Sequence, residues 1–156
     1  MKRISSPGAL NEATSYPDPV PFSRGMRLDL PSFSLIVLSG TASVGPQGES
    51  LHPGDFAGQA GRMLQNVTAL LVSEGAAWKD VFKTTIFLKD MVDYAEFAKI
   101  RMAHFREHDV TMLPASTCVQ ATLCRPEPLC EMEVMALLRG EEHGPGNEGE
   151  SRHDAS

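Results

Sequence analysis

The chain has 156 residues, of which 42% are hydrophobic and 22% charged, so it holds enough apolar material for one globular domain. Its formal net charge of −6 argues against nucleic acids and anionic membranes as partners. No run approaches the ~20 apolar residues that span a bilayer, and the N-terminus lacks the apolar segment of a secretory signal. Three cysteines, an odd number, favour free thiols, so we expect a cytoplasmic protein.

Both ends of the chain are expected to be flexible. Residues 1–15 are polar, and residues 140–156 contain five acidic residues and almost no apolar side chain. Ordering such a tail could not offset its loss of conformational entropy. The sequence therefore predicts one domain over residues 16–139, between a flexible N-terminal segment and a disordered acidic tail.

The first predicted elements of the domain are a strand and a helix. Residues 34–44 form an apolar, β-branched run that Gly40 interrupts, which is typical of a strand. A helix follows, with Asp55 as its N-cap and Gly75 as its C-terminal stop. Apolar residues between them recur at the helical period, so one face of this helix is expected to be buried.

A second strand and helix come next. Residues 81–88 predict a strand in which Phe82, Ile86 and Leu88 share one face. Residues 93–108 predict the second helix.

Two strands, 115–124 and 129–138, end the domain. Because side chains alternate along a strand, the last one has an apolar face and a mixed face. The apolar face holds Cys130, Met132, Val134, Ala136 and Leu138. The mixed face combines glutamates with aliphatic residues, so we expect the helices to cover one side of the sheet and another subunit to cover the other.

Four segments in order carry a likeness to a known family. They are Ser39-Gly40-Thr41; the helix from Gln59 to Gly75 with Asn66; residues 80–90; and residues 114–119 followed by Glu131-Met132-Glu133. These resemble the SG-(Q/T), Q-x6-N, third-strand and P-A-R-S-x-V…E-I-E segments of the Rid (reactive intermediate deaminase, YjgF-like) family. The likeness covers about residues 20–138.

This resemblance implies an α+β fold, with a single six-stranded mixed sheet and two helices packed on one face (chorismate-mutase-like). It also implies a homotrimer with a barrel-like core and clefts between neighbouring subunits. Members of the family hydrolyse reactive enamines and imines and release ammonia, without a metal or cofactor. We therefore expect a small carboxylate-bearing substrate and no cofactor.

The resemblance also assigns the main site residues. Glu131 matches the first glutamate of E-I-E, which positions or activates water. The family arginine that holds the substrate carboxylate is Ser116 here, and Phe22 stands where the family usually has a tyrosine. Because the guanidinium fork is missing, ordinary 2-aminoacrylate deamination is not expected. Arg24 and Arg125 are the candidate replacements, each with a surface arginine as the alternative.

Three small residues, Gly40, Cys118 and Cys124, are expected to line the pocket. The cysteines could act as nucleophiles only beside a base, and the sequence identifies none. We predict that Ser116, Cys118 and Glu131 converge in a groove that a second copy of the chain completes.

A metal site is not expected. Cys118, Cys124 and Cys130 are six residues apart with no nearby histidine, which is a poor match to zinc ligands. His104 and His108 share a helix face but lack the glutamate of a metal-binding helix.

The leading hypothesis is a cofactor-free hydrolase or deaminase that acts on a reactive enamine, imine or conjugated small acid. The alternative is a non-catalytic trimer that binds small molecules or acts as a chaperone. A second alternative is enol ether hydrolysis, because Cys124-Arg125-Pro126 followed by Glu131 also resembles the C-terminal half of chorismatases.

Overall fold

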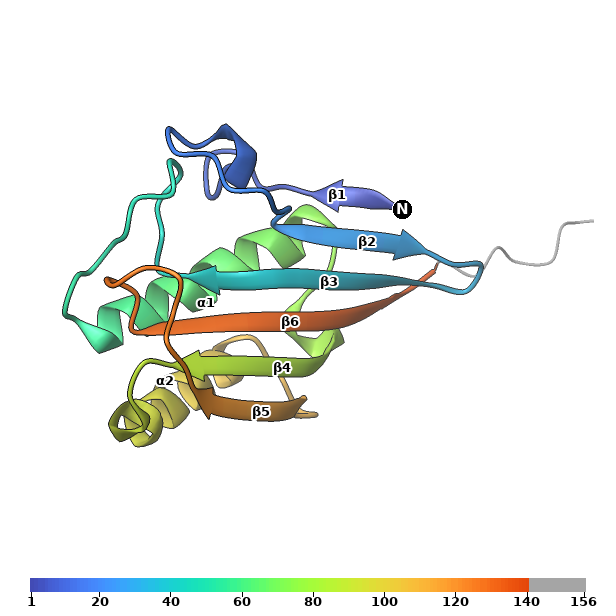
Figure 1. Ribbon diagram of the computed structural model, residues 1–156. Helices are drawn as coiled ribbons and strands as arrows, with labels where there is room; N and C mark the ends of the chain where they lie inside the picture. The colour runs from blue at the N-terminus through green and yellow to red at the C-terminus, as the bar shows by residue number, and fades with distance from the viewer. Residues whose placement is uncertain (141–156) are drawn as a thin grey trace, which may run out of the picture.

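The computed structural model describes residues 1–140 and contains one six-stranded sheet with two α-helices on one side (Figure 1). The helices are α1 (Phe56–Ser73) and α2 (Tyr94–Glu107). The strands are β1 (Lys2–Ile4), β2 (Gly25–Asp29), β3 (Phe33–Ala42), β4 (Val81–Leu88), β5 (Ala115–Gln120) and β6 (Cys130–Arg139). Short 3-10 helices lie at Ala13–Ser15, Trp78–Asp80 and Met91–Asp93.

The sheet order is β1-β2-β3-β6-β4-β5. Strands β4 and β5 are parallel, with α2 between them in the chain, and all other neighbours are antiparallel. The prediction of a six-stranded mixed sheet with two helices is thus confirmed.

Helix α1 begins and ends where the sequence predicts. The Asp55 side chain accepts a hydrogen bond of 3.0 Å from the backbone N–H of Gly58, which satisfies one free donor of the first turn. Gly75 follows the last turn with φ of +73°, a conformation that favours glycine. No helix in residues 1–140 has the length and apolar character needed to cross a bilayer.

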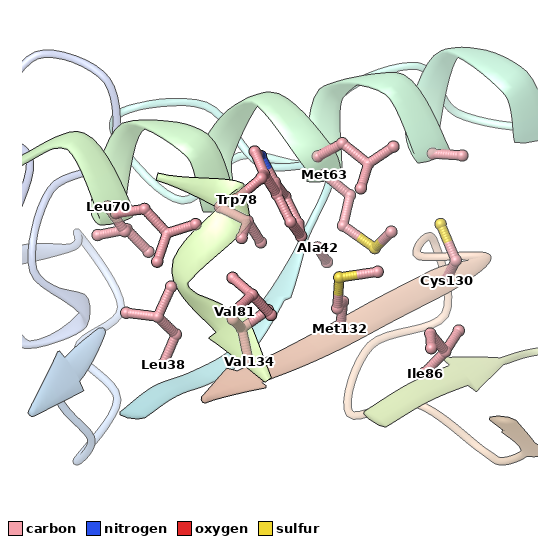
Figure 2. Close-up of a cluster of buried hydrophobic side chains, with 14 of the residues drawn as sticks. Leu38, Ala42, Met63, Leu70, Trp78, Val81, Ile86, Cys130, Met132 and Val134 are labelled. Carbon is pink, nitrogen blue, oxygen red and sulfur yellow. The ribbon is translucent and has the colours of Figure 1, made fainter. Parts of the chain in front are cut away.

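The core lies between α1 and the sheet (Figure 2). Met63 and Leu70 of α1 pack with Trp78 over strand residues such as Met132 and Val134. The predicted apolar face of β6 is confirmed, since Cys130, Met132, Val134 and Ala136 are each at most 1% exposed. Glu131 and the residues that alternate with this set therefore point to the side of the sheet without helices.

Two sequence predictions about the ends of the chain have different outcomes. Residues 1–15 were expected to be flexible, but β1 pairs with β2, and Ile4, Leu10 and Ala13 are fully buried. The reason is that a few apolar side chains in this polar segment reach the core. The predicted acidic tail, 140–156, lies outside the described residues except for Gly140.

Local irregularities of the backbone make two of the strand predictions wrong. Phe82 was expected to share a face with Ile86, but the register shifts between Val81 and Lys83. This bulge buries Val81 and leaves Phe82 44% exposed. The strand predicted over 115–124 ends at Gln120, so strand alternation does not continue to Cys124.

Candidate active site

A cavity of about 590 Å³ lies beside the end of β3 and the start of β6. Its walls come from residues 16–24, the end of β3, the loop at 47–49 and the loop at 124–128. Six of the predicted site residues line it: Phe22, Arg24, Gly40, Cys124, Arg125 and Glu131. Segments more than 100 residues apart in the sequence thus meet here, as the prediction requires for these six.

Glu131 contributes a carboxylate to the cavity from strand β6 of the sheet. It is the second residue of β6, paired with Ala42 on one side and with Phe87 on the other. Burial raises the pKa of Glu131, and the nearby Glu133 raises it further, whereas Arg125 and Arg24 oppose the shift. A carboxyl group with a raised pKa can accept and return a proton more readily near neutrality.

Gly40 makes room for this carboxylate. The pairing of β3 with β6 is irregular between Leu38 and Thr41, which places Gly40 at a bulge. A Cβ built on Gly40 would overlap the Glu131 carboxylate. The absence of a side chain at this position therefore lets Glu131 take its place in the cavity wall.

Arg24 is a buried cation that faces the same cavity. It is 4% exposed, and burial lowers its pKa to about 10, so it remains charged at neutral pH. Its guanidinium lies over the rings of Tyr16 and Phe22, at 5.0 and 5.1 Å from the ring centroids. Nη2 donates to the Tyr16 hydroxyl, and Nε donates to the Asn11 carbonyl at 3.3 Å.

No carboxylate within residues 1–140 forms an ion pair with Arg24. Glu12 acts on its charge from nearby, but the two carboxylate oxygens of Glu12 are buried and have no hydrogen-bond partner among the described residues. An unpaired buried cation is costly, and an anionic ligand in the cavity would reduce that cost.

Arg125 and Cys124 come from the loop before β6. Arg125 is exposed and donates from Nη1 to the Gly48 carbonyl at 2.6 Å, which joins two walls of the cavity. Its charge acts on both Arg24 and Glu131. Cys124 is exposed on the same wall.

Ser116 and Cys118 do not line this cavity within one chain, and their predicted convergence with Glu131 in a groove that a second copy completes stays a prediction. On β5 they pair with Thr84 and Ile86, which are both buried on the helix side of the sheet. The prediction required β5 to pair with β6, but β4 lies between them. A strand's two faces are set by its register, and this register turns both residues away from the cavity.

An arginine that was not among the predicted site residues, Arg101, lies beside Ser116 on the helix side of the sheet. Arg101 of α2 donates from Nη1 to the Ser116 hydroxyl at 2.8 Å. Burial raises the pKa of the Cys118 thiol, and Arg101 partly opposes that shift. A guanidinium thus reaches position 116 from α2 rather than from the strand itself.

Three other residues at or beside the cavity were not among the predicted site residues: Tyr16, Gln59 and Asn66. Tyr16 lines the cavity and binds Arg24, but it lies in a segment without strand or helix periodicity. Gln59 and Asn66 were noted only for their likeness to the family helix. Both are 1% exposed and bind backbone groups beside the cavity, Asn66 at the end of β3 and Gln59 in the loop before β6.

Residues 1–140 contain no group of three or more His, Cys, Asp and Glu side chains that could hold a metal ion. The histidines His104 and His108 lie together between the two helices, with ring centroids 4.3 Å apart. They are therefore separate from the cavity.

The role of Gly40 is testable with a single methyl group. In Gly40→Ala the Cβ should push the Glu131 carboxylate toward the open cavity, where it is better hydrated, so its raised pKa should fall. The backbone at Gly40 does not need a positive φ, so the free energy of unfolding should change by no more than about 1 kcal/mol. Carboxyl NMR titration and thermal unfolding would measure the two quantities.

Gly61→Ala is the matched control, because a Cβ at this helical position meets nothing within 4 Å. It should leave the Glu131 titration unchanged. An unchanged pKa in Gly40→Ala would show that Gly40 does not position the carboxylate.

Comparison with known proteins identifies the family to which the chain belongs. The family profile described as Endoribonuclease L-PSP matches residues 17–138. The 2-iminobutanoate/2-iminopropanoate deaminase of Escherichia coli strain K12 is 34% identical over 119 residues, 76% of this chain and 88% of that protein. The reactive intermediate deaminase TdcF of the same strain is 32% identical over 141 residues, 88% of this chain and 98% of that protein.

Solved structures agree with this result. The crystal structure of E. coli TdcF with bound serine has a TM-score of 0.73 at 30% identity, and covers 90% of this chain and 100% of that one. The E. coli YjgF gene product has a TM-score of 0.71 at 32% identity, over 87% of this chain and 98% of that one. The resemblance inferred from the sequence is confirmed, and the chain belongs to the Endoribonuclease L-PSP (YjgF/Rid) family.

Proposed function

We propose that this protein is a cofactor-independent deaminase that hydrolyses a reactive imine or enamine acid in the cavity beside Glu131. The observation that carries the proposal is that one cavity holds a half-buried carboxylate, that of Glu131, and the buried guanidinium of Arg24, which forms no ion pair within residues 1–140. The names of the relatives, 2-iminobutanoate/2-iminopropanoate deaminase and reactive intermediate deaminase, support the reaction class.

The proposed chemistry uses only groups of the chain. The Glu131 carboxylate accepts a proton from a water molecule as that water attacks the imine carbon. The imine reacts as the protonated iminium, so the adduct is a neutral carbinolamine. Glu131 returns the proton to its nitrogen, the C–N bond breaks as Glu131 takes the hydroxyl proton, and ammonia leaves with an oxo acid. A raised pKa suits a group that must both take and return this proton.

Arg24 is the better of the two predicted carboxylate binders. It is buried against two aromatic rings, so its position is fixed before the ligand enters. Arg125 is exposed, so its side chain is less fixed before a ligand enters. We propose that Arg125 adds positive charge at the cavity wall while Arg24 binds the carboxylate directly.

We also propose a homotrimer with intersubunit clefts, as the resemblance implies. The side of the sheet without helices exposes aliphatic side chains, among them Leu28, Val37 and Leu137, at 39–40% exposure. An apolar sheet face of this kind favours contact with another subunit. Ser116 and Cys118 would then reach a substrate only from a neighbouring subunit.

The three thiols are free, and a cytoplasmic location stays a prediction.

RNA cleavage is not proposed, although the family description contains that activity. The chain carries a net charge of −6, and the cavity contains Asp18 and Glu49 besides Glu131. Phosphate backbones are bound through clusters of Lys and Arg, and two arginines against three acidic residues do not form one.

The function is tested with imines made in place by an L-amino acid oxidase or threonine dehydratase, with ammonia release as the readout. We expect the protein to accelerate the release, and Glu131→Gln to lower kcat/KM by roughly 10²–10⁴-fold, the range of general acid–base groups. Glu96→Gln, at an exposed position on α2, should match the parent protein.

Absence of any rate above background would favour the non-catalytic binder. Turnover of enol ethers but not of imines would favour the chorismatase-like alternative.

The pH dependence gives a second test. If ionised Glu131 is the base, kcat/KM should rise with pH through its pKa, which lies above the ordinary value of 4.5. Glu133→Gln removes a negative neighbour and should move this acid limb to lower pH. Arg125→Gln removes a positive neighbour and should move it to higher pH. Shifts in the same direction for both variants would exclude Glu131 as the titrating group.

The assembly can be tested separately by light scattering. Leu137→Arg places a charge on the exposed apolar sheet face and should convert the trimer to a monomer. Val72→Arg, at a 63% exposed position on α1, should leave the trimer intact. A parent protein that is monomeric at all concentrations would rule out the proposed trimer.

A further inference from the structure

A groove between α1 and α2 lies on the helix side of the molecule, away from the cavity beside Glu131. Thr68 lines it from α1, and His104, Glu107 and His108 line it from α2. The helices cover the side of the sheet opposite to the exposed aliphatic face on which the subunit contact is proposed (Figure 1). A neighbouring subunit on that face does not complete this groove, so its geometry is that of the single chain.

The Thr68 hydroxyl fixes the proton position on one histidine ring of the groove. A hydroxyl has one proton to donate and two lone pairs that accept. Thr68 Oγ1 donates its proton to the Leu64 carbonyl at 2.8 Å and accepts from the indole N–H of Trp78 at 2.8 Å. One lone pair is left for His104 Nε2, which lies 3.5 Å away, at the outer limit of hydrogen-bond distances. His104 Nε2 therefore carries the ring proton, and the lone pair of Nδ1 is left free.

His108 brings a second imidazole beside this ring. The two ring centroids are 4.3 Å apart, because residues four apart share a helix face. An ion that binds imidazole nitrogens at about 2.0–2.1 Å can join two nitrogens that lie roughly 4 Å apart or less. His108 is exposed and its ring forms no hydrogen bond within residues 1–140, so the ring can rotate to meet such an ion.

The charges around the two rings favour a cation. His108 is the C-cap of α2, and the free carbonyls at a helix C-terminus carry the negative end of the helix dipole. Glu107 lines the same groove and forms no ion pair within residues 1–140. Arg106, the nearest cation along the chain, is not among the residues that line the groove.

We propose that His104 and His108 bind one divalent transition-metal ion, such as Zn²⁺ or Ni²⁺, with water in the remaining coordination positions. His104 binds through Nδ1 while Thr68 holds its Nε2–H, which is how ligating histidines are commonly oriented. Imidazole suits Zn²⁺, Ni²⁺ and Cu²⁺, whereas Mg²⁺ prefers oxygen ligands. Two protein ligands, rather than the four of a structural zinc site, make the ion exchangeable.

This site is independent of the proposed function. The sequence predicted no metal here because the helix lacks the glutamate of a metal-binding helix. The pattern of residues does not show which nitrogen of His104 is free, since that depends on the packing of Thr68 and Trp78 from other elements.

Calorimetric titration of the full chain with Ni²⁺ tests the site. Ni²⁺ is the probe because Cu²⁺ oxidises thiols, and the chain has three free cysteines. His104→Asn and His108→Asn should each lower the Ni²⁺ affinity by at least about tenfold, since loss of an outer partner alone costs that much. His52→Asn is the matched control outside the groove and should bind like the parent, because asparagine tolerates the φ of +55° at this position. An affinity that neither groove variant changes would overturn the inference.

The ring proton gives a second test that does not depend on affinity. Long-range ¹H–¹⁵N correlation of the metal-free protein should place the His104 proton on Nε2, and Zn²⁺ should shift the Nδ1 resonance. Thr68→Val removes the acceptor and should weaken Ni²⁺ binding roughly 10–100-fold, whereas Thr68→Ser keeps the hydroxyl and should bind like the parent. A His104 proton on Nδ1 in the parent protein, or equal Ni²⁺ affinity of the two Thr68 variants, would overturn the proposed site.

Discussion

Two buried amides on α1 hold the backbone on which the cavity depends. Gln59 donates to the Glu127 carbonyl at 3.0 Å and accepts from the Leu129 N–H at 2.7 Å, which fixes the approach to β6 two residues before Glu131. Asn66 donates to the carbonyls of Ala42 and Val44 at 3.0 and 2.9 Å, just past Gly40. Buried polar groups must be satisfied, so these bonds tie both cavity walls to the helix that forms the core.

The two opposite charges in the cavity, Arg24 and Glu131, do not form an ion pair with each other. Arg24 is buried and forms no ion pair within residues 1–140, and Glu131 is half-buried with a raised pKa. Each group would cost less if the two formed an ion pair. Held apart in one cavity, they can instead act on an anionic ligand and on water, as the proposed imine hydrolysis requires.

Small backbone irregularities decide which side chains reach the site. The bulge in β3 brings Gly40 against Glu131, and the shift in β4 leaves Phe82 exposed. The parallel pairing of β5 with β4 turns Ser116 and Cys118 to the helix side, where Arg101 binds Ser116. A register change of one residue moves a side chain to the other face of a sheet, so the register decides which residues can line the cavity.

Sequence patterns alone determined the family, both helices and the buried face of β6, and they predicted six residues that line the cavity, because these follow from local periodicity, caps and motifs. Glu131 and Arg24 are among these six. Only the tertiary structure decided that Tyr16 accepts a hydrogen bond from Arg24 and that Ser116 faces α2. These contacts depend on which strands become neighbours and on where an irregular N-terminal segment lies, and no short-range pattern encodes either.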